Sequence, residues 1–267
     1  MKVSVIIPAF NQTAKLMRSL ATLRAQSIPL HEIIVVDDGS KTPIESQPGI
    51  IVTRLEREPV HRGSSAAKNH GARLATGDYL CFADSDILHM PDAMESLVAS
   101  LPEWEYNTLI NVFRVSLPRG YHKKYYASMD RLDKSCSDTV LHTDPDMTIG
   151  ATCWEQNCGI INRNYFWSLG GYDESTFRSW GFNNQDLCAR VILDGGHVTS
   201  HISRVSTGKR LYCYHIWHRA PRGDKQAKRE WTGKWGEEFS ATWMRRLYAL
   251  VESGDVSIYE HNIRRAA

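Results

Sequence analysis

The chain lacks any run of apolar residues long enough to cross a membrane, because no stretch approaches the roughly 20 apolar residues that a spanning helix needs. The apolar segment at the start of the chain is too short for a signal peptide and passes at once into a strand pattern. We therefore expect a soluble protein with no integral membrane segment.

A strong net charge is also missing, since 32 Lys and Arg residues stand against 30 Asp and Glu residues. Nucleic-acid binders capture phosphates with a positive field that this composition does not provide. The late segment "HRAPRGDKQAKREW" is locally basic, which is more typical of a solvated helical face, with an acidic ligand nearby as the alternative. We expect no nucleic-acid partner.

The cysteines lack a pairing pattern. None of the six forms a pair at zinc-ribbon or redox-motif spacing, and several sit in apolar runs where a free thiol packs as a small hydrophobe. This usage favours a reducing, cytoplasmic location. The chain also shows no internal repeat, low-complexity tract or obvious linker.

The first hundred residues alternate between strand and helix patterns. With 267 residues, 42% of them hydrophobic, the chain is long enough for one large domain or a domain with an appendage. A β-α-β-α-β order predicts a parallel sheet with helices on its faces, hence an α/β fold. The expected strands cover residues 2–10, 32–40, 49–56 and 78–86, and the expected helices cover 13–27 and 63–77.

The remaining chain is less regular. Glycines at 195 and 196 are typical of a helix stop, and five large apolar residues near the end recur at helical spacing. That stripe is more typical of core packing than of a sugar-binding platform. The expected strands cover residues 106–115, 158–163, 197–202 and 210–217, with a helix over 184–196. The stripe consists of Trp231, Trp235, Phe239, Trp243 and Leu247.

Three polar segments follow expected strands, at residues 8–11, 37–40 and 84–86. Ligands of such sheets bind beyond the carboxyl ends of the strands, so these segments should meet at one edge. Asp84 and Asp86 can share one hard divalent cation with a bound diphosphate, with a capped turn as the alternative. Asp37 or Asp38 can accept from a base N–H or a ribose hydroxyl, with an Asx turn as the alternative.

Four segments carry a resemblance: "VSVIIPAFN", "IIVVDDGS", "GSSAAKNHGARLATGDYLCFADSD" and "GGYDESTFRSWGFNNQDLCARVILDGG". In this order they resemble family 2 glycosyltransferases of the GT-A fold and relatives such as chondroitin polymerase modules, β4-galactosyltransferases and polypeptide GalNAc-transferases. The resemblance implies a Rossmann-like GT-A domain over residues 1–220, with a nucleotide-binding half (1–100) and an acceptor half (101–220). Residues 221–267 would form a helical C-terminal extension packing on it.

The resemblance also implies a donor site. Asp38 would read the uracil ring, Asp86 would bind Mn²⁺ or Mg²⁺, and Asp84 would face the ribose and the metal. His215 would complete the metal site, with His218 as the fallback and an ordinary core histidine as the alternative. A histidine ligand favours Mn²⁺. The further residues placed near the nucleotide are Pro8, Phe10, Asn11, Lys68 (usually arginine in the family), Asn69 and Ser85.

On the acceptor side, Trp180 resembles a tryptophan at the interface of donor and acceptor, with core packing as the alternative. Asn183 and Asn184 stand where inverting relatives carry Glu-Asp, and asparagine cannot deprotonate a hydroxyl. Asp186 can take the place of the base and give inversion, which "CYHIWH" slightly favours. Alternatively the enzyme retains configuration, as polypeptide GalNAc-transferases with asparagine at the position of Asn184 do, and the departing phosphate takes the proton.

The sequence thus predicts a metal-dependent hexosyl- or N-acetylhexosaminyltransferase. It would move a sugar from a UDP-sugar to a hydroxyl group of a glycan, lipid-linked or protein acceptor. The alternatives are a retaining enzyme acting on Ser or Thr, and a catalytically silent module that binds nucleotide sugars.

Overall fold

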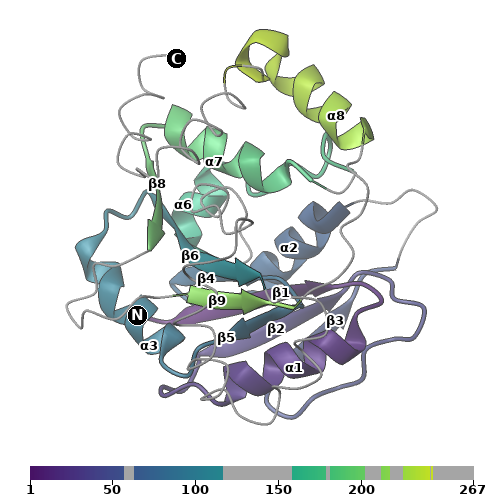
Figure 1. Cartoon of the computed structure of the whole chain (residues 1–267), viewed down its shortest axis with the longest axis vertical. Helices are drawn as coiled ribbons and strands as arrows, with labels where there is room; N and C mark the ends of the chain where they lie inside the picture. Colours follow the sequence, from purple (N-terminus) through teal and green to yellow (C-terminus); the bar gives the residue numbers. More distant parts are fainter. Residues whose placement is uncertain are drawn as a thin grey trace.

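The fold is described from a computed structural model of the chain. It describes residues 1–56, 63–116, 158–178, 181–201, 212–216, 225–240 and 242. A central sheet carries helices on both faces, with α1 on one side and α2, α6 and α7 on the other (Figure 1). The predictions for Trp180, His218, Trp243 and Leu247 lie outside the described residues.

The first part of the sheet is parallel, as predicted. Its order is β3-β2-β1-β4, and all three pairings within it are parallel. Parallel neighbours need crossover connections. Helix α1 lies between β1 and β2 and helix α2 between β3 and β4, whereas residues 38–50 between β2 and β3 hold no helix. The elements are β1 (Val3–Ala9), α1 (Thr13–Arg24), β2 (Glu32–Asp37), β3 (Ile51–Arg54), α2 (Gly63–Leu74) and β4 (Tyr79–Ala83).

The second part of the sheet is mixed. β7 runs antiparallel to both β4 and β6. β6 is paired in parallel with β8 and with β9, and β9 is paired antiparallel with β5. Parallel pairings still outnumber antiparallel ones, so the predicted α/β fold with a mostly parallel sheet is confirmed. The elements are β5 (Ile87–His89), α3 (Ala93–Ser100), β6 (Thr108–Ser116), β7 (Cys158–Asn162), α6 (Arg163–Ser168), α7 (Asn183–Leu193), β8 (His197–His201), β9 (Tyr212–His215) and α8 (Lys225–Trp235).

Alternating side chains of the central strands build two cores. Val5 and Ile7 face α1 and α3, whereas Ile6 faces α2, α6 and α7, because successive side chains of a strand point to opposite faces. Gly71 lets α2 approach β1 closely, since a Cβ placed there would lie 2.5 Å from Cγ2 of Ile6. Helices therefore pack on both faces of the sheet, and the predicted polar segments lie at the ends of its strands.

The predicted aromatic stripe of the C-terminal segment is core packing in its described part. Trp231 is 1% exposed, and its ring contacts those of Trp235 and Phe239 at centroid distances of 6.0 and 6.2 Å. Among the described residues, no helix is long and apolar enough to span a membrane.

Candidate functional site

Hydrogen bonds tie together the three polar strand ends. After β1, the backbone N–H of Asn11 donates to Ser40 Oγ (2.9 Å), and Asn11 Oδ1 accepts from the backbone N–H of Lys41 (2.8 Å). The next residue, Gln12, accepts from Ser85 Oγ at 3.2 Å. The segments after β1, β2 and β4 therefore meet at one edge, as the sequence predicts.

The two acids after β2 differ in their surroundings. Asp37 accepts from the backbone N–H groups of Ser40 (2.8 Å) and Ile44 (3.2 Å) and pairs with the Arg54 guanidinium (2.6 Å). Burial raises the pKa of Asp37, but these hydrogen bonds outweigh it and the pKa is lowered. Asp37 thus closes the turn after β2, and the neighbouring Asp38, 8% exposed, remains the predicted reader of the base.

Asp86 and His215 lie side by side although they are far apart in the sequence. Antiparallel pairing sets Ile87 opposite His215, and the backbone N–H of Ile216 donates to the carbonyl oxygen of Asp86 (2.9 Å). His215 Nε2 is 3.6 Å from Asp86 Oδ1, and Lys15 Nζ is 3.4 Å from Asp86 Oδ2. The two predicted metal ligands therefore share one side of the sheet edge.

This pair fits a divalent cation that also takes ligands from its substrate. Two ligand atoms at about 2.1 Å from one octahedral ion are about 3 Å apart, so the 3.6 Å between His215 and Asp86 needs only a small side-chain adjustment. Within the described ranges, no three His, Cys, Asp or Glu side chains form a metal site. An ion at Asp86 would thus depend on phosphate oxygens, as is usual for ions that accompany nucleotides.

Lys68 connects the donor edge with α7. Its side chain is buried, and Nζ donates to Asn184 Oδ1 at 2.9 Å and lies 5.0 Å from the centroid of the Tyr172 ring. Burial lowers the pKa of Lys68, and the nearby charge of Asp84 opposes this shift. Because an ammonium only donates, the Asn184 carbonyl must face Lys68, and its NH₂ group faces elsewhere.

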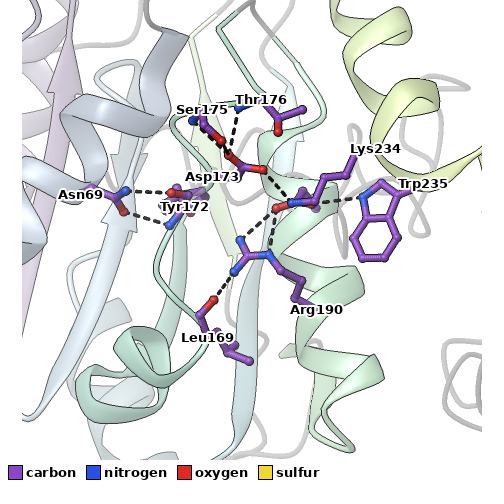
Figure 2. A network of polar contacts seen from close by, with 10 residues as sticks. Asn69, Leu169, Tyr172, Asp173, Ser175, Thr176, Arg190, Lys234 and Trp235 are labelled. Carbon is purple, nitrogen blue, oxygen red and sulfur yellow. Dashed lines mark hydrogen bonds and ion pairs between the residues drawn. The ribbon is translucent and has the colours of Figure 1, made fainter.

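Asn69 holds a loop. Its amide donates to the carbonyl oxygen of Tyr172 (2.8 Å) and to Glu174 Oε1 (2.7 Å), and its Oδ1 accepts from the Tyr172 N–H (2.9 Å), as Figure 2 shows in part. These bonds use most of what one amide can make. A contact of Asn69 with the nucleotide stays a prediction, whereas its support of the loop is observed.

Asp186 is surrounded by donors, which are the Arg190, Lys234 and Trp235 side chains labelled in Figure 2. It is 0% exposed, and its Oδ2 accepts from Arg190 Nε at 2.9 Å. Its Oδ1 lies 2.8 Å from Lys234 Nζ and accepts from Trp235 Nε1 at 3.1 Å. A buried carboxylate saturated by two cations and an indole N–H is placed to anchor helices, and this geometry gives no support to the prediction that Asp186 acts as the base.

A cavity of about 470 Å³ lies next to this network rather than at the strand ends. Its lining residues come from α2, the segment 169–175, α7 and α8. Cations at its wall are paired, with Arg73 on Glu174 (2.9 Å) and Lys234 on Asp173 (2.8 Å). It contains none of the predicted metal ligands, so we place the functional site at the strand ends.

Sequence reasoning missed Gln12, Lys15, Lys234 and Trp235. Gln12 and Lys15 come shortly after β1, and this position alone indicates that they lie near the site. A lysine in the first turn of a helix, however, cannot be distinguished in the sequence from an ordinary solvent-exposed lysine. Lys234 and Trp235 lie in a tail without a recognisable motif, and nothing in the sequence pairs them with Asp186.

The α/β fold with acids after β2 and β4 fits the resemblance to family 2 glycosyltransferases, and sequence comparison agrees with that family. The profile of glycosyl transferase family 2 matches residues 4–152, more than half of the chain. The protein belongs to this family.

Curated relatives cover most of the chain at modest identity. This chain is 28% identical over 203 residues, or 73% of its length, to a pre-mycofactocin glycosyltransferase of Mycobacterium tuberculosis. It is 27% identical over 232 residues, or 77% of its length, to a validoxylamine A glucosyltransferase of Streptomyces hygroscopicus. A polypeptide N-acetylgalactosaminyltransferase 8 of Drosophila melanogaster is 28% identical over 219 residues (73%). The chain spans 40%, 54% and 36% of the length of these relatives, respectively.

Solved structures confirm the GT-A fold. GalNAc-T7, solved with UDP, GalNAc and Mn²⁺, matches 90% of this chain with a TM-score of 0.62 and 18% identity, over 49% of its own length. TarS of S. aureus with UDP-GlcNAc matches 83% of the chain (TM-score 0.56, 16% identity, 60% of its own length). The mannosyltransferase PcManGT of Pyrobaculum calidifontis, with GDP-Man and Mn²⁺, matches 83% (TM-score 0.53, 19% identity, 58% of its own length).

Proposed function

We propose that the protein is a metal-dependent glycosyltransferase that moves a sugar from a UDP-sugar to a hydroxyl acceptor. The observation that carries this proposal is the convergence of Asp86 and His215, 3.6 Å apart, at the edge where the segments after β1, β2 and β4 are hydrogen-bonded together. A carboxylate and an imidazole are a ligand pair that suits Mn²⁺ in company with phosphate oxygens.

The donor is proposed as a UDP-sugar for two reasons. Asp38 lies after β2, at the edge where a base N–H would need an acceptor, and Asp37 beside it is occupied with the turn. Two of the three structural neighbours described above were solved with UDP or UDP-GlcNAc, although the third holds GDP-Man. The proposal leaves the sugar and the acceptor open among hexoses and N-acetylhexosamines, and among glycan, lipid-linked and protein hydroxyls.

In the proposed reaction the bond between the sugar C1 and the β-phosphate oxygen breaks, and a bond between C1 and the acceptor oxygen forms. A divalent ion at Asp86 and His215 would neutralise charge that develops on the leaving diphosphate. Lys68, which interacts electrostatically with Asp84, can supply a positive charge from α2, and its burial strengthens its attraction for an anion.

The surroundings of Asp186 favour the retaining alternative for the stereochemistry. A general base needs a lone pair directed at the acceptor hydroxyl, and both oxygens of Asp186 already accept from Arg190, Lys234 and Trp235. In the retaining alternative a phosphate oxygen of the leaving UDP takes the acceptor proton, so no base at Asp186 is required. Proton NMR of the product anomer distinguishes the two outcomes.

The test is UDP release from UDP-glucose, UDP-galactose, UDP-GlcNAc and UDP-GalNAc, with and without Mn²⁺. We expect slow donor hydrolysis with at least one of them, dependent on Mn²⁺ and lost in Asp86→Asn. Asp78→Asn is the matched control, because Asp78 precedes the same strand, β4, at its opposite end. UDP binding without any release from the four donors would instead support the silent binding module.

A further inference from the structure

The chain takes an unusual conformation just before α7. Phe182 has φ 59°, in the left-handed region, and the preceding Gly181 has φ 113°. Glycine adopts such angles freely, but a bulky residue does so only where its surroundings hold it there. This strained turn leads directly into Asn183 and Asn184, the first residues of α7 and the pair that stands where inverting relatives carry their acids.

Helix α8 packs against this turn. The ring of Phe182 stacks on Trp231 with a centroid distance of 5.5 Å and an interplanar angle of 25°. Trp231 is almost fully buried, and a Cβ placed on Gly181 would lie 3.7 Å from Cβ of Ala227, also on α8. The surface of α8 therefore contacts both residues of the strained turn, and in Figure 1 it lies beside the start of α7.

A second attachment joins α8 to the first turn of α7 (Figure 2). Lys234 Nζ lies 2.8 Å from Asp186 Oδ1 and 2.8 Å from Asp173 Oδ2, and Trp235 Nε1 donates to the same oxygen of Asp186 at 3.1 Å. Lys234 thus bridges a carboxylate of α7 and a carboxylate of the loop before it. Because Asp186 is fully buried whereas the Lys234 side chain is 24% exposed, water and salt screen this charge pairing only in part.

The two asparagines that follow this turn are hydrogen-bonded to α2, on the donor side of the site. Asn183 Nδ2 donates to Ser64 Oγ at 2.9 Å, and Asn184 Oδ1 accepts from Lys68 Nζ at 2.9 Å. Both partners lie on α2, one of them at its first turn. A shift of the turn at 181–182 would move both asparagines relative to α2 and so change the direction in which the Asn184 NH₂ group points.

From these contacts we propose that Lys234 and Trp235 are positioning residues, which act through Asp186, and through the turn at 181–182 on which Trp231 stacks, to set Asn184 against Lys68. The inference rests on the proposed transferase function, and it assigns a role to the C-terminal segment. Within the described part of the chain, the polar contacts of Lys234 and Trp235 are with Asp186 and Asp173, away from the strand ends where the metal and the nucleotide are placed. Their loss should therefore lower turnover while the affinity for UDP stays unchanged.

The experiment compares Lys234→Met with Lys228→Met, the same change on the exposed side of α8. UDP release from the most active donor gives kcat and KM, and calorimetric titration with Mn²⁺ gives the Kd of UDP. We expect kcat of Lys234→Met to fall by about tenfold or more, because small displacements of aligned groups have effects of this size. The Kd of UDP should stay within about twofold, and Lys228→Met should match the wild type.

Two further variants keep the test decisive. Trp235→Phe removes the indole N–H that reaches Asp186 while keeping an aromatic ring there, and it should lower kcat by a smaller factor in the same direction if Lys234→Met does not fold. Lys234→Arg keeps the charge and should restore part of kcat.

Wild-type kcat in both Lys234→Met and Trp235→Phe would overturn the proposal. So would a parallel loss of kcat and UDP affinity, since that would show general support of the fold. A wild-type protein that neither binds UDP nor releases it from any donor would refute the proposed function, and this inference with it.

Discussion

Lys68→Met separates stability from function at the donor site. Lys68 is 1% exposed, and its Nζ donates to Asn184 Oδ1 at 2.9 Å. Burial penalises the charged form of Lys68 by desolvation, so an apolar side chain of similar length removes that cost. The unpaired oxygen of the half-buried Asn184 costs about 1 kcal/mol in return. We therefore expect the free energy of unfolding to be unchanged or raised by up to about 2 kcal/mol.

The affinity for UDP should change in the opposite sense. A charge-assisted hydrogen bond to a phosphate contributes about 1.5–3 kcal/mol, so the Kd of UDP should rise by roughly 10- to 150-fold. The pH dependence supplies a second signature. Because burial lowers the pKa of Lys68 in the folded state, the folded protein binds fewer protons than the unfolded chain between that pKa and the unperturbed value of 10.5. Wild-type stability therefore gains from this group as pH rises through that window, and the variant lacks the gain.

The assays are urea denaturation at pH 7 and pH 10 and calorimetric titration of UDP with Mn²⁺, with Lys228→Met as the control. The predicted stability advantage of Lys68→Met over the wild type shrinks between the two pH values. A variant destabilised by more than about 2 kcal/mol with unchanged affinity for UDP would refute the reasoning, because Lys68 would then be a structural residue.

Three further predictions concern the core and the anchor of α7. Burial lowers the pKa of His89 to about 4, so the folded state binds fewer protons than the unfolded state between pH 4 and 6.5. Wild-type stability should therefore fall by about 3 kcal/mol over that range on acidification, and urea melts of His89→Leu should lack this loss. In Gly71→Ala the new methyl group overlaps the Ile6 side chain, so the free energy of unfolding should fall by about 1–3 kcal/mol. An unchanged urea midpoint would contradict this. Asp186→Asn should lower the free energy of unfolding by about 1–3 kcal/mol, because the partly buried Arg190 loses its carboxylate partner while Lys234 keeps Asp173; a folded variant of normal stability without activity would instead identify Asp186 as the base.

The long elements of the fold were predictable because their apolar residues repeat with the period of a strand or a helix. The predicted strands and helices begin within two residues of their expected starts, and α1 and α2 end early where the chain turns, whereas α3 and α6 were not predicted. β5 was not predicted as a strand of its own, because three residues are too few to show a period. Its pairing with β9 is nevertheless what brings Asp86 to His215.

The candidate site was predictable where a residue type alone limits the chemistry. The acids after β4 predicted a bound cation, and those after β2 predicted a contact with the nucleobase. The structure distinguishes Asp37, which closes a turn, from Asp38. Asp186 shows the limit of this approach. Its position in the sequence fits a general base, but its role depends on Lys234 and Trp235, which approach from another helix and carry no motif.

The central claim is that Asp86 and His215 hold a divalent ion together with the diphosphate of the donor. Calorimetric titration of UDP into the wild type, Asp86→Asn and the control Asp78→Asn, each with and without Mn²⁺, tests it most directly. We expect binding that requires Mn²⁺ in the wild type and the control, and a rise in Kd of at least about tenfold in Asp86→Asn. Equal affinity for UDP with and without Mn²⁺, unaffected by Asp86→Asn, would contradict the account.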